Sequence, residues 1–307
     1  MPSFLNNYFY GKAGKADYTP EQMPKNRVQL FFEMLRIHLS GMVGVNLIYV
    51  VFCIPALLWT LLNTQVLLIP EAEAAEVAVG ALMQNVLPTY LLLMIPCLVI
   101  AGIGAPGMMY VLRNWARDQH SFSFSDYKDN VKQNWKCGAL TGLINGASLY
   151  IAYIAYSFYG SMSSQSILFI VPQMLVLIVC ALWWMINMLI FPMMVTYDMN
   201  FVQLVRNCAL ISLARMPLSI AFLLGALLIP VLVVLLAPGY AIIFLVLFYL
   251  VIGFSLTGFA YASYANSCFD KYLNPKIEGA PINMGLRDPS LDDDDEDDEE
   301  GEDAPAT

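Results

Sequence analysis

The chain has 307 residues, of which 59% are hydrophobic and only 13% are charged. A soluble domain has roughly 45–50% apolar and about 25% charged residues, so this composition excludes an ordinary soluble domain and, with a mean hydropathy of +0.62, indicates a protein embedded in lipid. The net charge of −9 belongs to the C-terminal tail, because 12 of the 24 acidic residues lie from Asp288 onward and the rest of the chain has a balance of +3.

The first part of the chain is polar and then becomes amphipathic. Residues 1–26 contain no apolar core, so we expect no cleaved signal peptide. Residues 27–39 place apolar side chains at helical spacing on one side, which predicts an amphipathic helix in the membrane interface. The same pattern recurs in residues 124–136 and 201–214, each time before a pair of long apolar stretches.

Six stretches are long and apolar enough to cross a bilayer, which takes about 20 residues. They are residues 41–62, 87–111, 137–159, 167–191, 218–236 and 240–262. Pro96 and Pro106 interrupt the second stretch. Such breaks are tolerated in membrane helices because neighbouring helices satisfy the freed backbone groups.

The lysines and arginines predict the orientation of these stretches. All 15 of them precede the first stretch, separate the second from the third or the fourth from the fifth, or follow the sixth. The three opposite loops, 63–86, 160–166 and 237–239, hold none. Because positive charge marks the cytoplasmic side, we predict an all-α polytopic membrane protein with six transmembrane helices as three hairpins, interfacial amphipathic helices and both termini in the cytoplasm.

This topology divides the chain into four parts. Residues 1–26 form a cytoplasmic N-terminal segment, 27–269 the six-span membrane domain, 270–287 a cytoplasmic C-terminal segment, and 288–307 an acidic tail. We expect the tail to be disordered, because a run of acidic residues has no apolar surface to bury.

The types of residue in the six stretches limit the chemistry that the protein can perform. They contain no Asp, Glu, Lys, Arg or His, whereas ionisable residues inside a membrane usually mark proton relays and ion paths. His38 and His120 lie in cytoplasmic segments, and the six cysteines are scattered singly. We therefore predict no catalytic residue, no cofactor and no metal site. The buried amides predict interhelical hydrogen bonds or, as a less favoured alternative, a path for a small polar solute; they are Asn46, Asn145, Gln173 and Asn187.

Two glycine patterns predict close helix packing. The run from Gly102 to Gly107 matches GxGxxG, but it contains a proline and lies within an apolar stretch rather than after a strand, which favours packing over nucleotide binding. Gly138, Gly142 and Gly146 form a double GxxxG pattern at the start of the third stretch. They predict the close approach of another helix, with packing inside the chain favoured over dimerisation.

The segment between the second and third stretches is basic and aromatic. Its candidate contact residues are Arg113, Trp115, Arg117, Phe124, Tyr127 and Trp135. The favoured interpretation is an interfacial segment whose cations reach lipid phosphates. The alternative is a docking surface for a protein partner.

A set of short motifs is spread over residues 27–286. They are Phe31-Phe32, residues 46–55, residues 104–117, residues 124–127 with 134–136, residues 270–274, and Gly285-Leu286. Together they resemble the YesL-like family of bacterial integral membrane proteins of unknown function. Members of this family are typically encoded beside carbohydrate importers of the ATP-binding-cassette (ABC) type. The resemblance therefore implies an accessory role in sugar uptake and contact with importer permease subunits, and it supplies no catalytic residue.

We expect a non-enzymatic, multi-pass protein of the bacterial cytoplasmic membrane that contacts membrane lipids and does not bind nucleic acid. Its expected function is that of an accessory or assembly factor of a carbohydrate importer. The second hypothesis is a small-solute permease that uses the Gly- and Pro-broken second stretch and the buried amides as a path. An intramembrane enzyme is the third, and substitutions at Asn46, Asn145 and Asn187 would test it.

Overall fold

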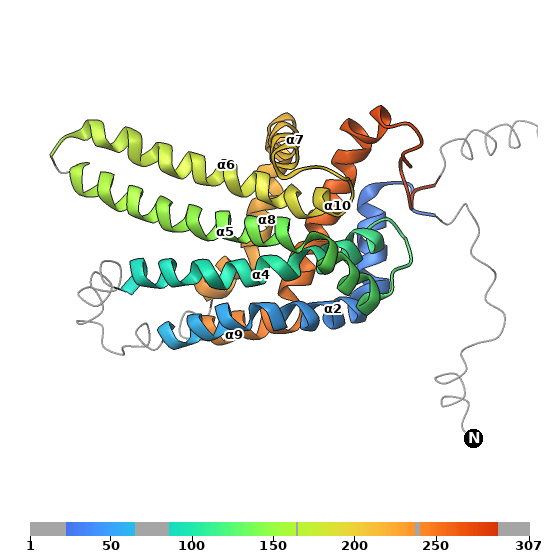
Figure 1. Ribbon diagram of the computed structural model, residues 1–307, viewed down its shortest axis with the longest axis horizontal. Helices are drawn as coiled ribbons and strands as arrows, with labels where there is room; N and C mark the ends of the chain where they lie inside the picture. Colours follow the sequence, from blue (N-terminus) through green and yellow to red (C-terminus); the bar gives the residue numbers. More distant parts are fainter. Residues whose placement is uncertain (1–22, 65–85, 164, 237–239, 288–307) are drawn as a thin grey trace, which may run out of the picture.

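The structure, a computed structural model, describes residues 23–64, 86–163, 165–236 and 240–287, and within these ranges every regular element is helical (Figure 1). The predicted all-α class is confirmed. The longer helices are α2 (Arg27–Thr64), α4 (Leu87–Trp115), α5 (Ser123–Ser163), α6 (Ile170–Met194), α7 (Phe201–Ala214), α8 (Met216–Leu236), α9 (Ala241–Phe248) and α10 (Phe254–Tyr272). Short helical turns are η3 (Ile167–Phe169), η5 (Tyr249–Gly253) and η6 (Asn274–Lys276).

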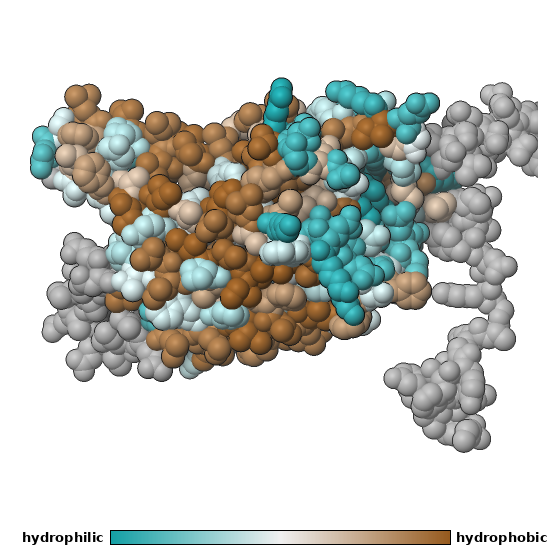
Figure 2. All heavy atoms as spheres, in the orientation of Figure 1, coloured by the Kyte–Doolittle hydropathy of each residue, from teal (hydrophilic) through white to brown (hydrophobic). Residues whose placement is uncertain are grey.

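Six helical segments are long and apolar enough to span a membrane. The first five each contain the predicted stretch, and the sixth, Ile243–Lys276, contains all but the first three residues of the stretch predicted at 240–262. The fourth joins η3 to α6, and the sixth joins α9, η5 and α10. Many of their apolar side chains point outward, and Figure 2 shows a mostly hydrophobic surface along the helices. Hydrophilic side chains gather toward the end of the molecule where the described chain begins and ends. These features are those of a protein whose sides face lipid.

The predicted interfacial helices at 27–39 and 124–136 are not separate elements, which corrects the sequence-based expectation. Each continues without a break into the following span, giving helices of 38 residues in α2 and 41 residues in α5. At about 1.5 Å per residue, both are much longer than the roughly 30 Å hydrocarbon core of a bilayer. No proline separates the amphipathic part from the span in either helix, so the backbone ladder continues. The third predicted segment, α7, is a helix of its own.

The first turns of α2 run across the direction of the rest of that helix in Figure 1. The Ser40-Gly41 pair lies between the two predicted segments of α2, and Gly/Ser pairs are sites where helices bend. Gly41 also lies against the indole of Trp115, because a Cβ atom there would come within 2.9 Å of the ring. The bend therefore brings the start of α2 against the end of α4.

The glycines of α4 and α5 bring these two helices into close contact. A Cβ atom on Gly102 would come within 3.1 Å of the Gly142 backbone, and one on Gly142 would come within 2.9 Å of the Leu98 carbonyl carbon. Gly146 lies in the same way against Ile95, and Gly138 against Gly102. The double GxxxG pattern of α5 thus faces α4 of the same chain.

Asn46 holds the sixth span against α2. It is fully buried, and its Nδ2 donates to the carbonyls of Tyr249 and Leu250, at 2.9 Å each, while its Oδ1 accepts from the Ser255 amide at 3.0 Å. These backbone groups belong to or follow η5, a π-helical turn. The predicted interhelical role of Asn46 is confirmed, and the amide satisfies backbone groups that the change of helical pitch leaves free.

Candidate functional site

The six predicted contact residues do not form one surface. Trp115 is 4% exposed, Arg117 8% and Tyr127 3%, whereas Phe124 is 68% and Trp135 47% exposed. Direct contact of the three buried side chains with lipid or an outside partner is incompatible with this burial, so that part of the prediction is wrong. Arg113 is half-buried. Only Phe124 and Trp135 remain well placed for an outside contact.

Neighbours distant in sequence cover the buried members of this set. The Trp115 indole stacks on the His38 imidazole of α2 with ring centroids 4.8 Å apart and an interplanar angle of 5°. The Tyr127 ring lies 6.3 Å from the ring of Phe52, also on α2. Because the bent α2 wraps around the end of α4, aromatic side chains that the sequence assigns to a loop become part of the core.

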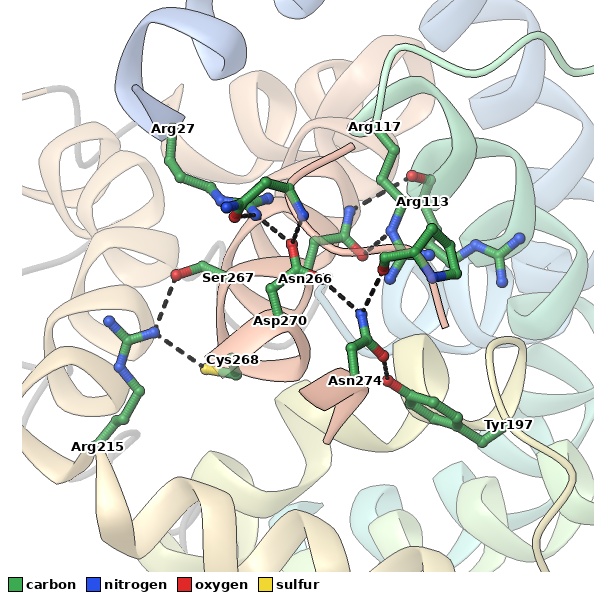
Figure 3. A network of polar contacts seen from close by, with 12 residues as sticks. Arg27, Arg113, Arg117, Tyr197, Arg215, Asn266, Ser267, Cys268, Asp270 and Asn274 are labelled. Carbon is green, nitrogen blue, oxygen red and sulfur yellow. Dashed lines mark hydrogen bonds and ion pairs between the residues drawn. The ribbon is translucent and has the colours of Figure 1, made fainter. Parts of the chain in front are cut away.

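Arg117 points into a polar cluster at the end of α4 rather than outward, and Arg113 takes part in this cluster through its carbonyl (Figure 3). The Arg113 Nη1 donates to the Val195 carbonyl at 2.6 Å. The Arg117 Nε donates to Asn266 Oδ1 at 2.9 Å, and the Asn266 amide in turn donates to the Arg113 carbonyl at 3.5 Å. These bonds join the end of α4 to α10 and to the segment after α6.

Asp270 is the acceptor at the centre of this cluster. Its carboxylate pairs with Arg27 at the start of α2. It also accepts hydrogen bonds from the backbone N–H of Asn283 at 3.1 Å and from Asn274 Nδ2 at 2.5 Å. The Tyr197 hydroxyl donates to Asn274 Oδ1 at 2.6 Å. The cluster therefore connects five separate parts of the chain: the start of α2, the end of α4, the segment between α6 and α7, α10, and the segment that follows it.

Burial governs the electrostatics of the cluster. It lowers the pKa of the Arg117 guanidinium, an effect that nearby Asp270 opposes. It also raises the pKa of the Tyr197 hydroxyl to about 12, so that this group remains a hydrogen-bond donor at neutral pH. Among the described residues, Arg117 Nη2 is buried without a hydrogen-bond partner. We interpret the cluster as a structural clamp, because its bonds link chain segments and its one carboxylate is already paired.

Sequence reasoning did not assign a role to the clamp residues in and just after α10. Asn266 and Asp270 of α10 and Asn274 at the start of η6 are spaced by four residues, a spacing that places residues along one side of a helix. Polar residues at that spacing just after an apolar span are a signal that could have indicated them. Their partners could not be deduced, because Arg117 and Asn266 are 149 residues apart.

A cavity of about 650 Å³ lies between α4, α5, α6, α8 and the η5–α10 segment. Most of its lining is apolar, and no charged residue lines it. The polar residues that line it are Asn145, Asn187, Tyr249, Thr257 and Tyr261, together with Tyr49. Both polar atoms of the Asn145 side chain form hydrogen bonds: Nδ2 donates to Asn187 Oδ1 at 3.0 Å, and Oδ1 accepts from Trp183 Nε1 at 3.0 Å.

The described ranges contain no cluster of side chains that could bind a metal ion. No group of three or more His, Cys, Asp or Glu side chains there is placed to hold a metal ion. The free cysteines in these ranges are likewise separate from one another, with Cys53, Cys208 and Cys268 buried.

Comparison with known proteins gives one family match. Residues 42–156 match the family described as a protein of unknown function, DUF624. The matched region extends from within α2, through α4, to within α5, so it contains the close α4–α5 contact, Arg113 and Arg117. No curated protein and no solved structure matches the chain.

Proposed function

We propose that this chain is a multi-pass protein of a bacterial cytoplasmic membrane that serves as an accessory or assembly factor of an ABC-type carbohydrate importer. Its six spans would form three hairpins with both termini in the cytoplasm. The YesL-like resemblance supports the importer link, and the match of residues 42–156 to a family of unknown function is compatible with it. The gathering of hydrophilic side chains at one end of the molecule supports the orientation.

The observation that carries the contact role is an exposed aromatic stripe on α5. Phe124 and Trp135 are eleven residues apart, which at about 100° per residue puts them on nearly the same side of the helix. Both are exposed, and the exposed Lys128 lies beside them. Aromatic side chains beside a cation at the end of a membrane helix suit contact with a permease subunit at the level of the lipid headgroups.

Association with the importer is tested by co-purification in mild detergent. We expect the chain to recover permease subunits, and the pair Phe124→Ala and Trp135→Ala to reduce their recovery at least tenfold while the protein stays folded. Val202→Ala is the matched control, because Val202 is 76% exposed on α7. The proposal would be contradicted if the wild type, the double variant and the Val202→Ala control recovered equal amounts of permease subunit, or if none of them recovered any.

The orientation is tested with a single cysteine at Ser163, the last residue of α5. In a variant without the native cysteines, we expect Ser163→Cys to react with a membrane-impermeant maleimide from outside intact cells. A cysteine at Asn283, on the side proposed to be cytoplasmic, should react only after the cells are broken. The reverse pattern would show that the orientation is wrong.

A small-solute permease is the second candidate, and the cavity between the helices favours it. Pro96 and Pro106 lie within α4, so one wall of the cavity is built from a helix that can change shape. Uptake of solute by liposomes that contain only the purified chain would support this function. Recovery with permease subunits and no uptake by such liposomes would support the accessory role.

A further inference from the structure

We propose that the cavity between α4, α5, α6, α8 and the η5–α10 segment binds one uncharged, lipid-like molecule with a hydrocarbon chain and a hydroxyl-bearing head group. The cavity holds about 650 Å³, which lies within the range of sites for ligands of moderate size. This inference does not depend on the importer proposal, because it rests on the lining of the cavity alone.

The lining determines the charge and the polarity of the occupant. No Asp, Glu, Lys, Arg or His contributes to it, and apolar side chains make up most of the wall. A charged head group placed there would lose its hydration without a counter-charge. A sugar would leave most of its hydroxyl groups unpaired for the same reason. The fitting ligand is therefore neutral and mainly hydrocarbon.

A few polar groups remain for the head group of such a ligand. In the part of the chain that the structure describes, the hydroxyls of Tyr249, Thr257 and Tyr261 make no hydrogen bond, and Asn187 Nδ2 donates none, although Asn187 Oδ1 accepts one. The four residues are partly exposed rather than fully buried, so these polar groups are accessible to a ligand. All four line the same cavity, so a ligand hydroxyl or ester would supply acceptors and donors to them.

The position of Tyr249 depends on an unusual backbone feature. Tyr249 begins the π-helical turn η5, whose carbonyls are held by the fully buried Asn46. Single π-helical turns are rare in proteins as a whole, but those that occur are often found at functional sites. Here the turn places the Tyr249 side chain on the cavity wall, where its hydroxyl can form a hydrogen bond with a ligand head group.

The surroundings indicate how a lipid reaches the cavity. Leu177 of α6 and Leu227 of α8 line it and are also 47% and 50% exposed. Within α8, which the structure describes throughout, Ser219 is the one buried residue. The cavity therefore meets the apolar outer surface beside a loosely packed helix, at a level where acyl chains surround the protein.

The test uses quenching of Trp184, which lines the cavity. The full-length protein in phosphatidylcholine nanodiscs is titrated with a monoacylglycerol that carries a dibrominated stearoyl chain, a quencher of tryptophan fluorescence. We expect quenching that saturates at a low mole fraction and that Trp184→Phe strongly reduces. Lysophosphatidylglycerol with the same brominated chain should bind at least tenfold more weakly, because its head group is charged.

Two sets of variants separate the cavity from the outer surface. Ala181→Phe with Ala226→Phe fills the cavity and should weaken binding at least tenfold. Val179→Phe with Val234→Phe adds the same side chains at exposed positions of α6 and α8 that do not line it, and should leave binding unchanged. Tyr261→Phe and Thr257→Val keep the volume and remove a hydroxyl each, so each should weaken binding about fivefold.

The inference is overturned if the charged lysolipid binds as tightly as the monoacylglycerol, or if the filled variant binds like its control. The same conclusion follows if no saturable quenching is seen in the wild type. Should the filled variant fail to fold, the two hydroxyl variants decide: unchanged affinity in both would also overturn it.

Discussion

Gly142→Ala is expected to destabilise the folded protein by about 3 kcal/mol. The new Cβ atom would lie 2.9 Å from both the Leu98 carbonyl carbon and the Val99 Cα. These are backbone atoms of α4, so they cannot move aside as the end of a flexible side chain would. The two helices must separate, and contacts along the rest of α4 and α5 are lost with them. Equilibrium unfolding of the purified protein in detergent measures the change in free energy.

Gly44→Ala is the matched control for this substitution. Gly44 also lies within a long helix, but beyond its two chain neighbours and the surrounding helix backbone no atom comes within 4 Å of a Cβ atom placed there. Alanine at that position should be neutral or should stabilise the helix by about 0.5–1 kcal/mol. If Gly142→Ala were as stable as Gly44→Ala, the close approach of α4 and α5 would not be a feature of the folded protein.

Asp270→Ala should cost about 3 kcal/mol, because it removes the carboxylate that pairs with Arg27 and that accepts a hydrogen bond from the buried Asn274. The side chain of Asp270 is 9% exposed and its partner Arg27 is 23% exposed. Its removal also takes the acceptor from Asn274 Nδ2 and from the Asn283 amide. We expect the segment after α10 to detach from the start of α2, which limited proteolysis near residue 283 would detect together with the loss of stability.

Asp129→Ala removes the same charge at an exposed position of α5 and should change stability by less than about 0.5 kcal/mol. A second comparison uses Arg27→Met with Asp270→Ala. If the ion pair contributes to the clamp, the double variant loses less stability than the two single variants together. Strict additivity, or an effect of Asp270→Ala no larger than that of Asp129→Ala, would show that the clamp does not hold these segments together.

The sequence predicted the span positions well and the contact surface poorly, for a physical reason. Runs of apolar residues predict spans because the cost of exposing backbone and polar groups to hydrocarbon acts on each stretch separately. Burial of a residue between two spans depends instead on which distant element covers it. Trp115 and Tyr127 have the composition of interfacial side chains, yet α2 covers both.

The interfacial helices show the same limit in another way. The amphipathic pattern of residues 27–39 correctly indicated a helix, but it contained no signal for where that helix ends. Continuation into the span depends on the backbone at the junction, and neither α2 nor α5 has a proline there. The segment at Phe201–Ala214 does end, at Ala214, and Met216-Pro217 begins the next helix.

The sequence by itself determined the helical class of the described residues and the position of six apolar stretches without Asp, Glu, Lys, Arg or His, because composition acts locally along each helix. The tertiary structure alone decided that Arg117 turns inward to Asn266, that Asp270 joins the two ends of the described chain, and that neutral hydroxyls line one cavity. The two clamp contacts join residues more than a hundred positions apart, and the cavity has walls from several separate helices. Their geometry follows from how the helices pack, and no local pattern in the chain encodes it.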